Sequence, residues 1–381
     1  MEEDPSRFLD QIHVSPDDRL TVNVRDYGKS QSGETVNLNL KNSALVGLGA
    51  AAVGYGIGQM LLPASEELNG QVALISGGSR GLGLALAEKL LELGCHVALA
   101  ARSQEELDRA AKHLSKLRVR KARGTVATYT ADITDPQSIQ ALKASVMSRF
   151  DRIDILINNA GIIEVGTVES IQIPDFERAM QAMFWAHLHM TWAILPQMLE
   201  RRSGHIVNIS SIGGRVSIPR LLPYCAAKFA LTGFSEGLTV ELRPIGIKVL
   251  TVIPGLMRTG SHRQAKFKGN AAKEYAWFAL GAALPGISQP ARRAAHRIIR
   301  ALRTGKDECV TSLPAQVLNL VHGLAPSVTR DILTLAHQYL LPKPSPSTES
   351  VPGSVAHQKQ GALFHAMTTL GRQAAARFNE N

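Results

Sequence analysis

The chain has 381 residues, 45% of them apolar, which is long for one domain and enough for a sizeable globular core. Its three cysteines, Cys95, Cys225 and Cys309, are odd in number and widely spaced, which argues against a disulfide framework or a metal site and fits a reducing compartment. Lysine and arginine outnumber the acids by 42 to 32, and such an excess favours nucleic acid, anionic lipid or phosphorylated ligands as partners. Because aromatic residues make up only 5% and no known nucleic-acid motif is present, we expect no nucleic-acid partner.

The first 65 residues form two segments of different composition. Residues 1–42 are polar and mildly acidic with little periodicity, which predicts a disordered or loosely attached arm. Residues 43–65 carry no charged side chain, and the run 44–62 approaches the roughly 20 apolar residues that span a bilayer as a helix. Gly54 and Gly58 have the spacing of small residues in packed membrane helices. We predict a membrane-associated segment; the alternative is a helix that docks on this protein or on a partner.

From residue 71 onward, short apolar stretches alternate with longer helical patterns. The apolar stretches predict strands within 71–78, 96–101, 126–133, 153–161, 205–211, 247–255 and 308–314. The helical patterns cover 82–94, 103–117, 135–150, 175–200 and 222–243. This alternation predicts an α/β domain over 66–313, with a doubly wound parallel sheet covered by helices on both faces. Beyond it we predict apolar helices over 314–341 that break at Pro326, and a low-complexity linker with a terminal amphipathic segment over 342–381.

The first predicted strand ends in a glycine-rich turn, Ser76-Gly77-Gly78-Ser79-Arg80-Gly81-Leu82-Gly83. The glycines at 77, 81 and 83 permit a tight turn and bring a phosphate close to the backbone. The amides and the dipole at the start of the following helix favour an anion there. The turn therefore predicts a nucleotide-binding site.

The end of the second predicted strand discriminates between nucleotides. An acidic residue about 20 residues after the glycines would bind the ribose hydroxyls of NAD. Here Ala101 and Arg102 stand at this place, and Arg80 in the glycine turn is a second cation that can point the same way. Two guanidiniums without a carboxylate favour a 2′-phosphate and hence NADP. The alternative is a pair of solvated surface arginines.

A candidate acid–base group lies between residues 210 and 228. Tyr224 and Lys228 are four residues apart and share one face of a predicted helix. An ammonium favours phenolate over phenol, so we expect Lys228 to lower the pKa of Tyr224 from its usual value of about 10. Ser211 would hold a substrate oxygen within reach of the phenol.

These motifs, in this order, resemble those of the short-chain dehydrogenase/reductase family over about residues 71–313. The family's TGxxxGxG turn corresponds to residues 76–83, with serine in place of threonine, and its NNAG motif to residues 158–161. Asp132 matches the acidic residue beside the adenine, and Pro254-Gly255 with Thr259 matches the PGxxxT loop at the nicotinamide. Ser211, Tyr224 and Lys228 match the catalytic serine and the YxxxK pair. The resemblance implies a Rossmann-type fold.

The resemblance also implies the roles of the site residues. The residues expected to bind NADP(H) are Ser76, Gly77, Ser79, Arg80, Gly81, Leu82, Gly83, Arg102, Asp132, Ile133, Asn159, Ala160, Gly161, Tyr224, Lys228, Pro254, Gly255 and Thr259. Tyr224 would protonate a carbonyl oxygen while hydride passes to its carbon, Ser211 would orient the carbonyl, and Lys228 would bond the nicotinamide ribose. No metal is expected.

One departure concerns the helix before the serine. Met183 stands where the family usually has an asparagine that helps to hold a proton relay behind the lysine. A thioether is at best a weak acceptor and cannot donate. His187, one turn further on, is either a substitute in this relay or an ordinary helix histidine.

We therefore expect an NADP(H)-dependent oxidoreductase that interconverts a secondary alcohol and a ketone or aldehyde. Segment 256–290 should cover the substrate pocket, and its Trp277, Phe278 and Leu280 favour a lipophilic substrate. The alternative is a non-catalytic NADP-binding scaffold or redox sensor, for which Met183 is the supporting feature.

The distribution of charge around segment 43–65 bears on location. Arg25, Lys29 and Lys41 precede the segment, and within about 20 residues only Arg80 follows it, so the positive-inside tendency puts the arm in the cytoplasm. A single span would then separate the catalytic domain from cytosolic NADPH. Docking on a membrane surface avoids this conflict, and we expect membrane association with a cytoplasmic catalytic domain. A homo-oligomer is also compatible with the sequence.

Overall fold

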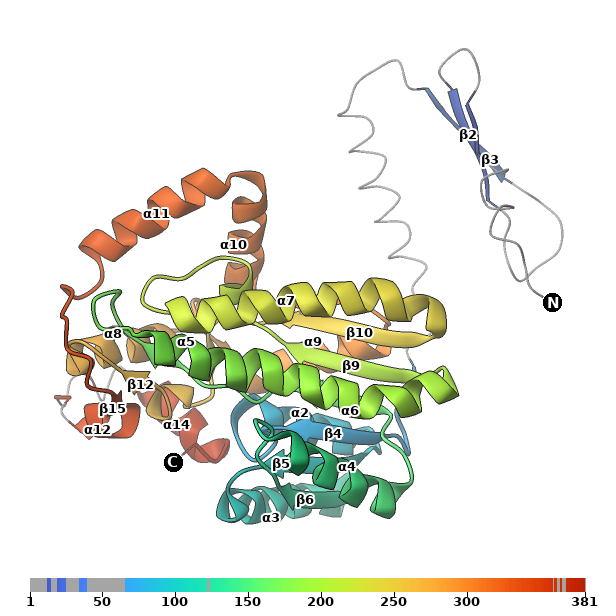
Figure 1. The fold of residues 1–381 in the computed structure, drawn as a ribbon, viewed down its shortest axis with the longest axis horizontal. Coiled ribbons are helices and arrows are strands. Elements are labelled where there is room, and N and C mark those ends of the chain that lie inside the picture. Colours follow the sequence, from blue (N-terminus) through green and yellow to red (C-terminus); the bar gives the residue numbers. More distant parts are fainter. Residues whose placement is uncertain are drawn as a thin grey trace. The chain divides into compact units, whose positions relative to one another are not determined.

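A sheet of seven parallel strands is the centre of the larger of the two units into which the chain divides, residues 1–64 and 65–381. The computed structural model describes residues 12–14, 19–24 and 34–39, and residues 66–380 except 122–123, 359, 362–363 and 365–367. The strands are β4 (Val72–Ser76), β5 (His96–Ala101), β6 (Val126–Thr130), β7 (Ile155–Asn158), β9 (Gly204–Ile209), β10 (Ile247–Ile253) and β14 (Glu308–Val310). Their order is β14-β10-β9-β7-β4-β5-β6, so the predicted doubly wound parallel sheet is confirmed (Figure 1).

Helices cover both faces of this sheet (Figure 1). One apolar core lies under α2 (Gly81–Glu92), α3 (Gln104–Lys121) and α9 (Ala291–Arg303). The other lies under α4 (Pro136–Phe150), α6 (Ala186–Arg201) and α7 (Leu222–Leu242). Because β4, β7 and β9 are buried on both faces, their sequences are almost continuously apolar.

The strand order changes direction between β4 and β7, which are neighbours although β5 and β6 lie between them in sequence. In such sheets ligands bind in the crevice outside the carboxyl ends of the strands at this switch point. A ligand site is therefore expected at the turn after β4 and the turn after β7.

The predicted helix over 175–200 is three consecutive elements. It consists of α5 (Ile173–Met180), a five-residue π-helix η2 (Gln181–Trp185) and α6. Short π-helical turns inside α-helices are frequent at functional sites. The other short elements of the domain are β8 (Glu164–Val165), η3 (Ile212–Gly214), η4 (Arg243–Ile245), β11 (Met257–Arg258), η5 (Ser261–Arg263), β12 (Lys266–Phe267), α8 (Ala271–Ala283) and β13 (Gln289–Pro290).

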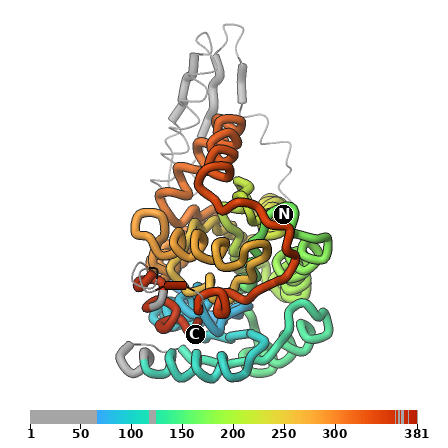
Figure 2. Tube along the Cα trace, turned by 90° about the vertical axis from the view of Figure 1, so that its left-hand side faces the viewer, coloured from blue at the N-terminus to red at the C-terminus, as the bar shows by residue number. Residues whose placement is uncertain are grey.

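The segment after β14 begins with two helices, α10 (Leu313–Leu324) and α11 (Pro326–Tyr339), which meet at Pro326 as predicted. Segment 342–350, expected to be part of a linker, lies against the domain, because Gly269 N–H donates to Ser347 O at 2.8 Å. The chain continues through β15 (Val351–Pro352), which pairs with β12, then α12 (Gly353–Gln358) and α14 (Thr369–Arg377). Figure 2 shows this C-terminal segment in red, running along the side of the domain to an end near the blue tube that begins the domain. Composition does not reveal this docking, since backbone groups make the bonds.

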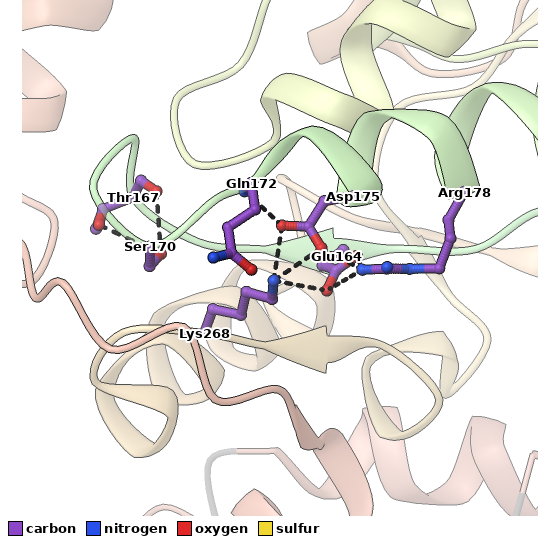
Figure 3. A network of polar contacts seen from close by, with 7 residues as sticks. All are labelled: Glu164, Thr167, Ser170, Gln172, Asp175, Arg178 and Lys268. Carbon is purple, nitrogen blue, oxygen red and sulfur yellow. Dashed lines mark hydrogen bonds and ion pairs between the residues drawn. The ribbon is translucent and has the colours of Figure 1, made fainter.

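A buried ionic network joins three of these elements (Figure 3). Lys268, at the end of β12, places Nζ 2.7 and 2.6 Å from the two carboxylate oxygens of Asp175 on α5. Its Nζ also lies 3.8 Å from Glu164 on β8, and Arg178 pairs with both carboxylates. Beside the network, Thr167 Oγ1 donates to Ser345 O at 3.1 Å. The network thus fixes the segment that follows β10 onto α5.

The N-terminal unit contains three strands, β1 (Ile12–Val14), β2 (Arg19–Val24) and β3 (Glu34–Asn39), in antiparallel order β1-β2-β3. Of the two alternatives for residues 1–42, a disordered arm does not describe these three strands, and a loosely attached arm stays a prediction. Apolar and polar residues alternate in β2 and β3, and the register pairs Leu20 with Leu38 and Val22 with Val36. Alternation over six residues is the pattern of a strand. The prediction for residues 1–42 was based on their polar composition and did not use this alternation.

The predicted membrane segment 43–65 lies outside the described residues. Within the described part of the chain, none of the helices combines the length and the apolar character needed to cross a membrane.

Candidate active site

A cleft of about 390 Å³ opens at the carboxyl ends of the strands, at the switch point between β4 and β7. Its lining includes every predicted site residue except two. The predicted residues that line it are Gly77, Ser79, Arg80, Gly81, Leu82, Arg102, Asp132, Ile133, Asn159, Ala160, Gly161, Ser211, Tyr224, Lys228, Pro254, Gly255 and Thr259. The structure therefore brings together residues spread over more than half of the described domain.

The two exceptions, Ser76 and Gly83, lie behind the residues that line the cleft and hold them in place. Ser76 Oγ donates to Ile157 O and accepts the N–H of Asn159 at 3.0 Å, which ties β4 to the turn after β7. A Cβ at Gly83 would lie 2.2 Å from Gly77 O, so only glycine allows the helix to start this close to the strand. These residues do not face the cleft and affect its shape through the turn.

The glycine turn has the form that an anion site requires. Gly77 and Gly81 have positive φ, +66° and +55°, a conformation that favours glycine. A Cβ at Gly77 would lie 2.9 Å from the Cα of Ala160, so the turns after β4 and β7 approach each other closely. Asn159 holds this approach, because its Nδ2 donates to Ser76 O at 3.2 Å and to Gly77 O at 3.0 Å.

The predicted catalytic residues meet around η3 and the start of α7. Ser211 directly precedes η3, and its Oγ accepts the N–H of Gly213 at 3.0 Å. A Cβ at Gly213 would lie 3.1 Å from Tyr224 Cε1 and 3.4 Å from Ser211 Oγ, so the hydroxyl and the phenol flank the same small space. Lys228 Nζ lies 5.9 Å from the centre of the Tyr224 ring and donates to Ile209 O at 2.7 Å.

The electrostatics of the pair differ from the sequence-based expectation. Burial raises the pKa of Tyr224 to about 12, although its hydrogen bond with Ser211 lowers it in part. Burial also lowers the pKa of Lys228 to about 7. The predicted downward shift of the Tyr224 pKa is therefore wrong in this structure. A lysine with such a pKa is protonated only in part at neutral pH, so it stabilises a phenolate less than a fully charged ammonium would.

Met183 lies at the place where the resemblance expects an asparagine. It is completely buried in η2. A Cβ at Gly161 would lie 3.5 Å from Met183 Sδ and 3.9 Å from Lys228 Nζ, so the thioether and the ammonium adjoin the same glycine.

His187 has a positional role. Its Nε2 lies 2.8 Å from Ala160 O, and a carbonyl only accepts, so Nε2 carries the proton. Burial, with a smaller effect of Lys228, lowers the pKa of His187 to about 3, so the ring is neutral. The ring therefore holds the turn after β7 in place, as an uncharged donor.

The two predicted cations differ in their surroundings. Arg80 Nη1 donates to Glu106 at 2.9 Å, and its Nε lies 3.8 Å from Glu380. Arg102 is exposed at the cleft, and in the described part of the chain it has no ion-pair partner within 4 Å. Arg102 is thus the cation that is available to a ligand.

Sequence reasoning missed Glu106 and Glu380, which also line the cleft. Glu106 lies in the first turn of the helix predicted over 103–117, directly after the strand that ends beside Arg102, so its place near the carboxyl end of β5 was foreseeable. No local pattern connects Glu380 with a turn 300 residues earlier.

The aromatic residues of segment 256–290, which were predicted to cover the substrate pocket, pack elsewhere. Phe278 is buried and packs its ring edge-on to Phe267, with centres 5.9 Å apart, and Trp277 Nε1 donates to Glu274 at 2.6 Å. Neither aromatic residue lines the cleft, nor does Leu280. Apolar lining from the clusters that include Tyr224 comes from Ile162, Ile163 and Ala182.

The same domain is similar to known proteins. A family model described as short chain dehydrogenase matches residues 71–268. A dehydrogenase/reductase SDR family protein 7-like from Anopheles gambiae is 34% identical over 264 residues, which cover 69% of this chain and 82% of that protein. A fatty acyl-CoA reductase from Acinetobacter baylyi is 37% identical over 196 residues, 51% of this chain and 65% of that protein. The crystal structure of a short-chain dehydrogenase from Streptomyces avermitilis is 32% identical with a TM-score of 0.59, and the match covers 71% of this chain and 96% of that one.

Proposed function

Because the chain belongs to the short-chain dehydrogenase/reductase family of oxidoreductases, we propose that it uses NADP(H) to interconvert a secondary alcohol and a ketone. The observation that carries the proposal is the meeting of Ser211 and Tyr224 around one small space beside Lys228, inside the cleft that the glycine turn opens. The tight turn, the positive-φ glycines and the exposed Arg102 suit a phosphorylated dinucleotide.

When bound, the cofactor supplies or takes the hydride. In the reductive direction Tyr224 donates its proton to the carbonyl oxygen as hydride reaches the carbon, and in oxidation it takes the alcohol proton. Ser211 donates a hydrogen bond to the same oxygen and stabilises its developing negative charge. Lys228, held by Ile209 O, supplies the positive charge beside the phenol when it is protonated.

For the substrate we propose a lipophilic carbonyl compound or alcohol. Ile162, Ile163 and Ala182 belong to the same apolar clusters as Tyr224 and line the cleft, so they supply apolar surface on the side of the phenol. The name of the fatty acyl-CoA reductase relative supports a lipid-like substrate class. A screen that follows NADPH absorbance should show faster turnover of long-chain or polycyclic carbonyl compounds than of sugars. The reverse order would overturn the proposal.

Replacement of Arg102 tests the nucleotide preference. We expect Arg102→Ala to weaken NADPH binding by about ten-fold or more, because a guanidinium–phosphate hydrogen bond contributes about 1.5–3 kcal/mol, and to leave NADH binding within about two-fold. Isothermal titration calorimetry with both nucleotides measures this, and Arg330→Ala, at an exposed position on α11, is the control. Equal losses for NADPH and NADH would contradict a 2′-phosphate contact.

Replacement of Met183 tests whether the missing asparagine limits turnover. We expect Met183→Asn to raise kcat by about two- to ten-fold, because its amide can bond a water or backbone group behind Lys228 and assist proton transfer. Met183→Leu keeps the side chain apolar with a similar volume and should leave kcat unchanged. If neither wild type nor Met183→Asn turned over any carbonyl compound while both bound NADPH, the non-catalytic alternative would replace our proposal.

A further inference from the structure

The end of the described chain lies in the cleft, at the phosphate side. The N–H of Gly81, the first residue of α2, donates to Phe378 O at 2.9 Å. The first amides of a helix are the groups that bind phosphates in dinucleotide sites. One of these donors is therefore already bonded to a carbonyl of this chain.

Asn379 anchors the segment. Its Nδ2 donates to Ser79 O and to Glu106 O, both at 2.9 Å, and its Oδ1 accepts from Arg109 Nε at 2.7 Å. Asn379 has a φ of +59°, which asparagine tolerates better than most residues. Three hydrogen bonds of one side chain thus fix the segment to the glycine turn and to α3.

Glu380 fills the space between the glycine turn and the loop after β10. A Cβ at Gly81 would lie 2.7 Å from Glu380 Oε1, and a Cβ at Gly260 would lie 2.9 Å from Glu380 Cβ, so the Glu380 side chain packs against both segments. The same Cβ at Gly81 would lie 3.8 Å from Thr259 Cβ, which places the carboxylate beside two predicted cofactor residues. On the far side, a Cβ at Gly260 would lie 2.4 Å from the Cβ of Ala375 on α14. The segment therefore packs against both walls of the cleft.

The Glu380 carboxylate is poorly compensated there. Its side chain is 5% exposed, its Oε2 has no hydrogen-bond partner among the described residues, and the nearest cation atom, Arg80 Nε, lies 3.8 Å away. Burial and, more weakly, Glu106 raise the pKa of Glu380 to about 7, against the opposing effect of Arg80. Burying an incompletely paired charge costs free energy. The charge of Glu380 therefore destabilises the docked position of the segment and favours its release.

We propose that residues 369–380 are an autoinhibitory plug that occupies the phosphate position of the cofactor site and must leave before a dinucleotide binds. The proposal rests on the cleft being the dinucleotide site, and it does not depend on the preference for NADP. A pyrophosphate needs the amides at the start of α2 and the space beside Thr259, where a carbonyl and a carboxylate of this chain now lie. Two anionic groups do not share this position, so nucleotide affinity is reduced by the fraction of molecules in which the plug is docked.

The test compares nucleotide binding to full-length variants by isothermal titration calorimetry. Asn379→Ala removes the three anchoring hydrogen bonds and should lower the Kd for both NADPH and NADH by about five-fold or more. Ala375→Glu should act in the same direction, because it forces a charge against Gly260 in a closely packed contact. Gln373→Ala, at an exposed position of α14 away from the cleft, is the matched control and should change nothing.

A second readout uses the wild type. NADPH should accelerate tryptic cleavage after Arg372 and Arg377, seen as a loss of the last residues by mass spectrometry. An unchanged or higher Kd in Asn379→Ala, or slower cleavage with NADPH, would overturn the plug, since the segment would then be part of the bound site. Equal tightening for NADH and NADPH supports the plug even where the preference for NADP fails. Absence of nucleotide binding to the wild type and to both release variants would overturn the plug together with the proposed function.

Discussion

Replacing Tyr224 by phenylalanine is expected to lower kcat by about 10²- to 10⁴-fold on any carbonyl substrate, the range by which a positioned proton donor accelerates a reaction. The variant lacks only the hydroxyl that bonds to Ser211 and that, in the proposed mechanism, donates to the substrate oxygen. The ring still fills its place beside Gly213 and packs with Met183 and Ala227. Affinity for NADPH should therefore stay within about two-fold, because the glycine turn and Arg102 are unchanged. Steady-state kinetics and titration calorimetry measure the two quantities.

Tyr129 offers a matched control for this experiment. It is a partly buried tyrosine on β6, the strand at one edge of the sheet, and its hydroxyl has no hydrogen-bond partner among the described residues. Tyr129→Phe should leave kcat unchanged. Unaltered turnover in Tyr224→Phe would exclude the phenol as the proton donor, whereas a loss of nucleotide affinity would indicate a structural role.

The sheet and the cleft were predictable from sequence because both depend on local patterns. Strands buried on both faces are continuously apolar, and the carboxyl ends of parallel strands meet at one edge. The meeting of residues that follow those strands, such as Gly77, Asn159 and Ser211, can therefore be predicted without knowledge of tertiary contacts.

The remaining features depend on contacts between distant residues or on burial. The hydrogen bond of Asn379 to Ser79 spans 300 residues, and nothing in the composition of either segment points to the other. The segment with Trp277 and Phe278 is apolar in sequence, but only packing determines whether the rings face the cleft or Phe267. The pKa of Tyr224 depends mainly on desolvation. The four-residue spacing of Tyr224 and Lys228 gives no information about how deeply the two side chains are buried.

The ionic network around Lys268 is a further feature that no sequence motif predicted. Its disruption is expected to have the largest effect on stability. Lys268→Met is expected to lower the free energy of unfolding by about 3–5 kcal/mol, because removing one partner of a buried ion pair leaves uncompensated charge. The side chains of Lys268, Asp175 and Glu164 are 4%, 1% and 5% exposed, so water cannot replace the lost ammonium. Arg178 remains near both carboxylates but approaches from a half-exposed position.

Denaturant unfolding of Lys268→Met and of Lys266→Met separates this effect from a general loss of charge. Lys266 lies two residues earlier on β12 and is exposed, so its replacement should change stability by less than about 0.5 kcal/mol. Burial by itself would raise the pKa of Asp175, but its bonds with Lys268 and Gln172 outweigh burial and lower the pKa below its usual value. A lowered acid pKa gives stability that is present above the unfolded value and is lost as the pH falls through the folded value. Lys268→Met should therefore lose part of the acid-dependent stability of the wild type, and equal stability of the two lysine variants at neutral pH would show that the network contributes nothing.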